Sequence, residues 1–492
     1  MSFASATAVA VLLLLLQLAC IYCVYIAHVP PAITNWKSKW IYFGVALVFS
    51  DLSLTILAIN VVLFGVAAGC HVFDDTSKAL AVITEVAFAA NVLALLGSAA
   101  VGLVTAKRVI DKELQKMQNE GHSGASKIKR GSLLSYITSI RFIFASLLPY
   151  WRPLGLTMHS NITYLTSEEM SSLGITDATE QFVQLDVITS NSNKKARTSP
   201  THPRPVFMYI HGGAWSMGDK QKLVTPICWH MAQQGWVVVN INYRMNPLVK
   251  YPEHLIDCKR ALRWIRLNIS KFGGDPAFVV VSGGSAGGHL ASMMALTPNE
   301  PSFQPGFESI STELSACVPY YPVVDVTNAS GYPQGDFGLW FATSVSGLAR
   351  YDEAWLRKNA CPISLVPGQT KPGEVVDGSK AKIPPFLIFQ GHNDNIVPHP
   401  TVRAFEKKLR AVETTVPPHA HDSSLSSTAS HRAAIYMEFP YAHHAFDVFI
   451  NPRTNLVSWT AGQYLNGIYA EWESTQNNIS MSKLLDSCDR WR

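Results

Sequence analysis

Charged residues are scarce in this sequence. Only 15% of the 492 residues are Asp, Glu, Lys or Arg, whereas ordinary soluble domains contain about 25%. The net charge is only +5, and no Lys/Arg stripe with interleaved aromatic residues is present, which excludes a typical nucleic-acid-binding protein. A disordered or fibrous chain is excluded as well, because 48% of the residues are hydrophobic and can form a large core.

The shortage of charge is concentrated in residues 1–106, where only seven residues are charged. Each apolar run in this region can supply about 20 residues of helix, enough to cross a hydrocarbon core about 30 Å thick. The first run lacks a positively charged start and is longer than a signal-peptide core, which favours an uncleaved anchor. We therefore predict an N-terminal bundle of about three transmembrane helices, at about 3–27, 41–69 and 79–106.

Basic residues predict how this bundle is oriented. With three spans, the loop that carries Lys37 and Lys39 lies on the same side of the membrane as everything after the third span. Residues 107–130 carry a net charge of +4. The positive-inside rule makes this side cytoplasmic, so we expect a multi-pass membrane protein whose C-terminal domain faces the cytoplasm. The same basic segment can hold anionic lipid headgroups.

Residues 107–151 are expected to form a basic juxtamembrane linker. Its apolar stretch Leu133–Tyr150, interrupted by Arg141, is either an interfacial helix or a fourth span that would place the C-terminal domain in the lumen. Two carboxylates, Asp51 and Glu85, fall inside the predicted spans, where ionisable residues are functional candidates by default. We favour the alternative that both lie close enough to an interface to be solvated.

Cysteine is too sparse outside the spans to organise the fold. The five cysteines there are scattered, and none forms a CxxC pair. A disulfide framework and a structural zinc site are therefore not expected. Histidines clustered in residues 411–432 favour a solvated surface insertion over a metal-binding tract.

From about residue 152 onwards the pattern changes to alternating strands and helices. Short β-branched runs bounded by turn residues alternate with helical periodicity, which predicts a mostly parallel sheet covered on both faces. We expect one α/β domain over 152–492. Its strands are expected at 205–210, 236–242, 278–281, 385–389 and 435–439, and its helices at 254–267 and 289–296.

The motif Gly283-Gly284-Ser285-Ala286-Gly287 follows one of these strands and precedes a helix. This is the context that a G-x-S-x-G nucleophile turn requires, because only small neighbours let strand and helix approach so closely. The serine then projects above the sheet at a helix N-terminus, whose free N–H groups favour a developing anion. A phosphate-binding loop or a plain turn is the competing interpretation. Strand and helix together favour Ser285 as a nucleophile.

A second glycine motif, His211-Gly212-Gly213-Ala214-Trp215, comes directly after an earlier strand. Adjacent glycines allow backbone N–H groups to turn towards a substrate oxygen. Together with the amide of Ala286, the amides of Gly212 and Gly213 are expected to form an oxyanion hole. A tight turn alone would also use two glycines, but the two motifs in this order are more specific than either.

A serine nucleophile needs a base, and the base needs an acid to orient it. Asp394 follows the strand at 385–389, and His443 and His444 follow the strand at 435–439. Both positions are carboxyl ends of strands, where open α/β sheets build their sites. We choose Asp394 as the acid with Asp325 as runner-up, and either histidine remains a candidate base.

Seven ordered motifs between residues 200 and 465 resemble the hormone-sensitive-lipase-like carboxylesterases of the α/β-hydrolase superfamily, particularly the membrane-anchored esterases of actinobacteria. The resemblance implies an α/β-hydrolase fold, ester hydrolysis through an acyl-enzyme, and no metal or organic cofactor. It assigns the nucleophile to Ser285, the acid to Asp394 and the base to His444. The motifs are HGGAW, NYR (242–244), YPEHLIDCKRALRWI (251–265), FGGDP (272–276), GGSAGGHLA (283–291), GHNDNIVP (391–398) and HAFD (444–447).

The expected function is therefore that of a membrane-anchored serine carboxylesterase or lipase acting on a lipophilic ester, with no nucleic-acid partner. An arylformamidase or a prenylcysteine methylesterase on the same fold is the alternative enzyme, and a non-catalytic receptor or scaffold is the alternative outside enzymes. Residues 320–380, with Trp340, Phe341 and Trp355, are expected to form a cap over the acyl pocket or to serve as ordinary packing.

Overall fold

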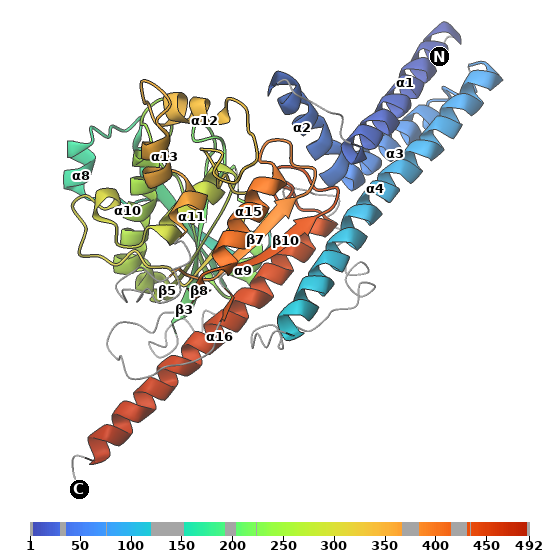
Figure 1. The fold of residues 1–492 in the computed structure, drawn as a ribbon. Coiled ribbons are helices and arrows are strands. Elements are labelled where there is room, and N and C mark those ends of the chain that lie inside the picture. Colours follow the sequence, from blue (N-terminus) through green and yellow to red (C-terminus); the bar gives the residue numbers. More distant parts are fainter. Residues whose placement is uncertain are drawn as a thin grey trace.

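The computed structural model describes residues 3–29, 36–74, 76–119, 152–191, 203–222, 224–366, 383–414, 431–432 and 434–489. The apolar stretch Leu133–Tyr150 and most of the predicted surface insertion at 411–432 lie outside the described residues. The chain forms a group of N-terminal helices, which we call the anchor, and a C-terminal α/β domain, which we call the hydrolase domain (Figure 1).

The anchor consists of α1 (Phe3–His28), α2 (Trp36–Asp51), α3 (Ser53–Gly69) and the first part of α4 (Lys78–Asn119). Helices α1 and α4 are each long and apolar enough to cross a membrane, and α2 with α3 qualifies only as a pair bent by 77°. The described residues thus provide two candidate spans, or three if the bent pair counts as one. The run at 41–69, expected as one continuous span, is broken at Leu52.

The two carboxylates of the anchor differ in their surroundings. Glu85 is exposed on α4, but Asp51 at the break between α2 and α3 is only 4% exposed. Its Oδ1 accepts a hydrogen bond from Arg453 Nη1 at 3.1 Å and one from Asn451 Nδ2 at 3.4 Å. The expectation that Asp51 is solvated near an interface is wrong, because the hydrolase domain supplies a buried counter-charge.

The hydrolase domain is built on an eight-stranded sheet with the order β1-β2-β4-β3-β5-β6-β7-β10. Only the pairs β1–β2 and β2–β4 are antiparallel, which confirms the predicted mostly parallel sheet. The strands are β1 (Leu156–Thr163), β2 (Gln184–Ser190), β3 (Arg204–Ile210), β4 (Val237–Ile241), β5 (Gly274–Gly284), β6 (Ala316–Tyr320), β7 (Phe386–Gly391) and β10 (Ala434–Phe439).

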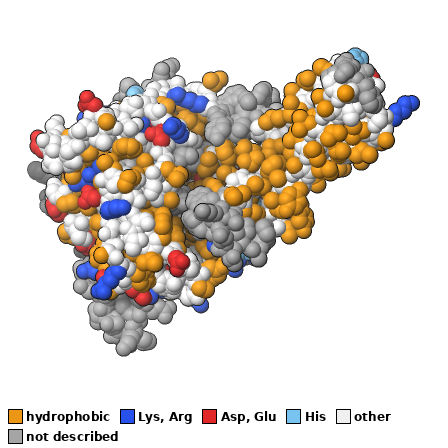
Figure 2. All heavy atoms as spheres, turned by 90° about the horizontal axis from the view of Figure 1, so that it is seen from above, with side chains coloured by type: hydrophobic (Ala, Val, Ile, Leu, Met, Phe, Trp, Pro, Cys, Tyr) orange, Lys and Arg blue, Asp and Glu red, His pale blue; other side chains and the backbone are white. Residues whose placement is uncertain are grey.

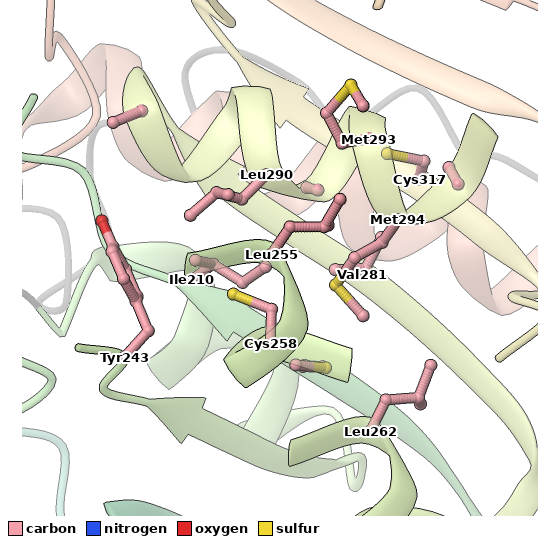
Figure 3. Packing of buried hydrophobic residues seen from close by; sticks show 14 of the residues in the cluster. Ile210, Tyr243, Leu255, Cys258, Leu262, Val281, Leu290, Met293, Met294 and Cys317 are labelled. Carbon is pink, nitrogen blue, oxygen red and sulfur yellow. The ribbon is translucent and has the colours of Figure 1, made fainter. Parts of the chain in front are cut away.

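Alternate residues of each central strand enter two different cores, one on each face of the sheet. In β3, Val206 and Met208 belong to one apolar cluster, and Phe207 and Tyr209 belong to the other. The first face is covered by α10 (Glu253–Asn268), α11 (Ala286–Leu296) and α15 (His399–Arg410) (Figure 3). The second face is covered by α9 (Pro226–Gln233) and α16 (Pro452–Asp489). Because both faces are buried, the central strands are mostly apolar.

Helix α4 also contributes to the second core. It runs without interruption across the boundary expected between 106 and 107, and Ile110, Leu114 and Met117 are buried against the same cluster as α9 and α16. The first part of the expected linker is therefore a helix that packs on the hydrolase domain. Figure 1 shows α4 leaving the anchor and passing beside α16.

Short elements complete the hydrolase domain. In the segment expected as a cap, 320–380, the structure describes residues 320–366. The short elements are α8 (Ser167–Ser172), α12 (Phe337–Trp340), α13 (Glu353–Asn359), α14 (Pro362–Leu365), the 3₁₀ turns η1 (Glu180–Val183), η3 (Ile269–Phe272) and η4 (Pro301–Phe303), the π-helical turn η5 (Phe341–Val345), and the strands β8 (Glu413–Thr414) and β9 (His431–Arg432).

Candidate active site

Ser285 occupies the sharp turn between β5 and α11. Its backbone has φ 56° and ψ −119°, a conformation that L-residues rarely adopt and that is typical of strained functional positions. The turn is tight enough that a Cβ on Gly287 would lie 2.1 Å from the carbonyl oxygen of Ile210. A side chain at position 287 would therefore push α11 away from β3. This is the steric reason for the small residues that the motif contains.

Ser285, His444 and Asp394 form a continuous chain of hydrogen bonds. His444 Nε2 lies 2.9 Å from Ser285 Oγ, and His444 Nδ1 lies 2.8 Å from Asp394 Oδ2. The other carboxylate oxygen of Asp394 accepts from the amides of Ile396 at 2.9 Å and Val397 at 2.8 Å. With Nδ1–H donated to Asp394, Nε2 is left as the acceptor that faces the serine hydroxyl.

The three side chains come from the carboxyl ends of three strands in one sheet. Ser285 follows β5, Asp394 lies in the loop after β7, and His444 lies in the loop after β10. Strands β5, β6, β7 and β10 are consecutive and parallel, so their carboxyl ends lie at one edge of the sheet. The structure thus brings Ser285 of the glycine motif together with Asp394 and His444, two of the residues that the carboxyl-end rule predicts.

The two alternatives left open by the sequence lie elsewhere. His443 Nε2 donates to the carbonyl oxygen of Ala27 in α1 at 2.6 Å, and burial lowers the pKa of His443 to about 4. The carboxylate of Asp325 turns back into its own loop, where it accepts from three backbone amides, those of Thr327, Ala329 and Ser330. Neither side chain is hydrogen-bonded to Ser285 or to His444.

The glycine loop after β3 lies against the nucleophile turn. A Cβ on Gly212 would lie 2.7 Å from the carbonyl oxygen of Gly284 and 3.4 Å from Ser285 Cβ, so the two turns are in direct contact. Gly213 has φ 123°, and a Cβ there would meet the carbonyl oxygen of Met217 at 1.9 Å. Ala286 opens α11 beside Ser285, at the helix terminus where unpaired N–H groups are available.

Ser285, His444, Gly212 and Gly213 line one cavity of about 280 Å³. Most of its wall is apolar, and Ser285 and His444 are among its few polar groups. Phe337 and Trp340 of the expected cap contribute to the wall, while Phe341 is fully buried against Trp215 with ring centroids 5.0 Å apart. Some aromatic residues of this segment therefore line the cavity, and others pack in the core.

Tyr321, Phe43 and Leu47 are among the cavity residues that no sequence motif indicates. Tyr321, directly after β6, donates its hydroxyl to the carboxylate of Asp447, and its ring lies 4.7 Å from that of His444. Its only sequence signal is its position at the carboxyl end of a strand. Phe43 and Leu47 of α2 also line the cavity. Nothing in a predicted membrane span indicates such a role.

Other parts of the quoted motifs are structural. Arg244 of NYR donates to both carboxylate oxygens of Asp257, with each nitrogen 2.8 Å from its oxygen, and also to Glu253 at 2.8 Å. Arg244 and Asp257 are buried, so this ion pair ties the loop after β4 to α10. These residues hold the glycine-loop side of the sheet in place.

One group among the described residues has ligand atoms close enough to hold a metal ion: His392, His399 and Glu438. The guanidinium of Arg403 already donates to both carboxylate oxygens of Glu438. None of the three residues lines the cavity that contains Ser285. This group is therefore separate from the candidate active site.

Parts of this chain are similar to known proteins. Residues 195–409 match the BD-FAE family. The probable carboxylic ester hydrolase LipM of Mycobacterium tuberculosis is 36% identical over 270 residues, which are 55% of this chain and 56% of LipM. Esterase LipQ of the same organism is 36% identical over 272 residues, which are 55% of this chain and 57% of LipQ. The chain thus spans little more than half the length of the curated relatives it matches.

Among solved structures, an esterase from Thermogutta terrifontis is 23% identical with a TM-score of 0.44, and the match covers 66% of this chain and 95% of that chain. The family match at 195–409 includes six of the seven motifs, all except HAFD at 444–447. The resemblance recognised in those motifs is thereby confirmed. Part of this chain is thus similar to curated carboxylic ester hydrolases and esterases, and residues 195–409 match the BD-FAE family.

Proposed function

We propose that this protein is a membrane-anchored serine carboxylesterase with Ser285, His444 and Asp394 as its catalytic triad. The observation that carries the proposal is the unbroken chain of hydrogen bonds from Ser285 Oγ to Asp394 at the wall of an apolar cavity. A serine hydroxyl is a weak nucleophile unless a neighbouring base accepts its proton, and this arrangement supplies one.

The reaction proceeds in two halves. Ser285 Oγ attacks the ester carbonyl carbon and its proton passes to His444 Nε2. The ester C–O bond then breaks, and the alcohol leaves with that proton while the acyl group stays on Oγ. In the second half, water attacks the acyl carbon, gives a proton to His444 and restores the serine as the acid departs. Asp394 stabilises the imidazolium, and the amides of Gly212–Gly213 and Ala286 bind the oxyanion.

The anchor supports membrane attachment. Helices α1 and α4 meet the length and hydropathy required of a span, and large apolar side chains cover the outer surface of the protruding helices (Figure 2). The basic residues at 107–130 follow the apolar part of α4, which by the positive-inside rule puts the hydrolase domain on the cytoplasmic side. An occupied glycosylation sequon at Asn161, which is exposed on β1, would contradict this orientation.

The test uses the full-length protein in detergent, because α4 packs into the hydrolase core. We expect a fluorophosphonate probe to label the wild type and Ser302→Ala, a matched change of an exposed serine, but not Ser285→Ala. Hydrolysis of p-nitrophenyl esters should follow the same pattern. Folded protein that shows neither labelling nor turnover would overturn the esterase proposal and favour a receptor or scaffold.

Turnover of an N-formyl aryl amide or of a prenylcysteine methyl ester in preference to simple esters would instead identify one of the alternative enzymes. Both reactions use the same acyl-transfer chemistry, so labelling of Ser285 alone does not distinguish them. Comparing kcat/KM values across the three substrate classes separates these activities.

A further inference from the structure

Helix α2 of the anchor lies between the other anchor helices and the hydrolase domain (Figure 1). Its residues Phe43 and Leu47, one turn apart on the same face, are part of the cavity wall that contains Ser285. The ring of Phe43 stands edge-on to that of His444, with centroids 5.9 Å apart. A segment of the anchor therefore reaches the reacting groups.

Polar contacts hold α2 at both of its ends. Near the start, the carbonyl oxygen of Lys39 accepts a hydrogen bond from Asn395 Nδ2 at 2.9 Å. Asn395 directly follows Asp394 in the chain. At the end, Asp51 pairs with Arg453 at 3.1 Å, and both side chains are less than 5% exposed. A buried pair of this kind is hard to separate, because either charge would be left without a partner.

Arg453 connects the break in the anchor to the loop that carries His444. Its Nη2 donates to the carbonyl oxygen of Tyr441 at 3.4 Å. Gly102 of α4 lies so close that a Cβ there would be 2.8 Å from the same nitrogen. The 77° bend after Asp51 turns α2 away from the direction of α3 and towards the cavity. The position of α2 is thus determined by contacts on each side of the active site.

The chemistry of the wall defines what this arrangement can bind. Phe43, Leu47, Val323, Trp340 and Val448 give an apolar lining, and no Asp, Glu, Lys or Arg is among the described residues of the wall. The opposite face of α2 is also apolar, because Ile41 is 71% and Val48 is 37% exposed. The face of α2 that lines the cavity can therefore contact the hydrocarbon chain of an ester whose carbonyl lies at Ser285, and the outer face does not line the cavity.

We propose that Phe43 and Leu47 of α2 form a specificity wall for the hydrocarbon chain of a membrane-resident ester, so that the anchor takes part in substrate selection as well as attachment. This inference rests on the proposed esterase function. The long hydrocarbon chain can belong to the acyl group or to the alcohol of the ester. These two kinds of ester differ only in the side of the carbonyl group on which the long chain lies.

The experiment measures kcat/KM of the full-length protein in nanodiscs for p-nitrophenyl laurate and p-nitrophenyl acetate. The variants are Phe43→Ala, Leu47→Ala and their combination, with Ile41→Ala as the matched control on the outer face of α2. We expect the laurate-to-acetate ratio to fall about tenfold in the double variant, because several methylene contacts are lost. Ile41→Ala should keep the wild-type ratio.

Dodecyl acetate and ethyl laurate form a second pair of substrates that separates a long alcohol from a long acyl chain. The member of the pair that loses more activity in the double variant identifies the side of the carbonyl that faces α2. The rate of fluorophosphonate labelling and the thermal midpoint show whether each variant is folded with an intact triad.

Two kinds of failure are distinguishable. A wild-type protein that hydrolyses none of these esters overturns the esterase proposal itself. A wild-type protein that hydrolyses both p-nitrophenyl esters, with a ratio that Phe43→Ala and Leu47→Ala leave unchanged, keeps the esterase proposal and overturns the role of α2.

Discussion

The anchor and the hydrolase domain place their apolar and polar residues in opposite ways. Large apolar side chains of the anchor point outward, such as Leu12 at 68% and Leu93 at 71% exposed. Its buried positions include Gln17, Asn60 and Asn91, which hydrogen-bond one another between α1, α3 and α4. The hydrolase domain buries apolar residues on both faces of its sheet.

This difference is the one expected if, as proposed, the anchor lies in a bilayer and the hydrolase domain in water. Helices in a bilayer gain nothing by hiding leucine, and they associate through close packing and hydrogen bonds between polar side chains. A domain in water buries its apolar surface instead. The two regions meet beside the candidate active site, where α2 and the loops after β7 and β10 are in contact. The predictions below test how far each region depends on the other.

The largest effect is expected within the hydrolase domain, at the acid of the triad. Asp394→Asn should lower kcat about a thousandfold or more, because an amide cannot hold His444 Nδ1–H in the tautomer that leaves Nε2 free to accept. Asp325→Asn is the matched control, since that carboxylate accepts from backbone amides of its own loop and from Cys361 Sγ and has no hydrogen bond to Ser285 or His444. Steady-state kinetics with p-nitrophenyl esters decides, and equal losses in both variants would contradict the assignment of Asp394.

The next effect concerns the contact between the two regions. Asp51→Asn should destabilise the protein by about 3–5 kcal/mol, because it leaves the buried Arg453 guanidinium without a counter-charge. The double variant Asp51→Asn/Arg453→Met should recover much of the loss. Thermal unfolding in detergent measures both. A single variant as stable as the wild type would show that the anchor and the hydrolase domain are not joined through this pair.

The third prediction compares the two ends of α4. Leu114→Ala should lower the free energy of unfolding by about 2–5 kcal/mol, since Leu114 is buried in the hydrolase core. Leu93→Ala, on the outward-facing part of the same helix, should change it by no more than about 0.5 kcal/mol. Similar values for the two variants would mean that α4 does not belong to the hydrolase core.

The smallest effect is a pH dependence at the edge of the active site. Burial raises the pKa of Asp447 from 3.8 to about 6, although Tyr321 donates a hydrogen bond to it. A raised pKa in the folded state means that the protonated form is favoured there. The protonated Asp447 carboxyl group thus stabilises the fold below pH 3.8, and this contribution is lost as the pH rises through about 6.

Asp447→Asn should therefore gain stability relative to the wild type between pH 4 and 7. Each unit of pKa shift corresponds to about 1.4 kcal/mol, so the gain should reach at most about 3 kcal/mol. Thermal midpoints of both proteins across this pH range provide the measurement. Parallel pH profiles would show that Asp447 does not titrate in this window.

Much of the hydrolase domain could be predicted from local patterns. The turn around Ser285 depends on five consecutive residues and the strand and helix beside them, so its sterics can be inferred without a structure. The carboxyl-end rule selected Asp394 and the pair His443 and His444 in the same way. It could not choose between the two histidines, because neighbouring residues in a loop point in directions that only the packed loop defines.

The sequence by itself determined the apolar spans, the parallel sheet and the residue types of the candidate triad, because periodicity and turn chemistry act over a few neighbouring residues. Tertiary structure alone decided that the run at 41–69 bends at Leu52, that Asp51 finds Arg453 402 residues away, and that Phe43 lines the cavity. Contacts between such distant segments follow from how whole elements pack. No local pattern records them.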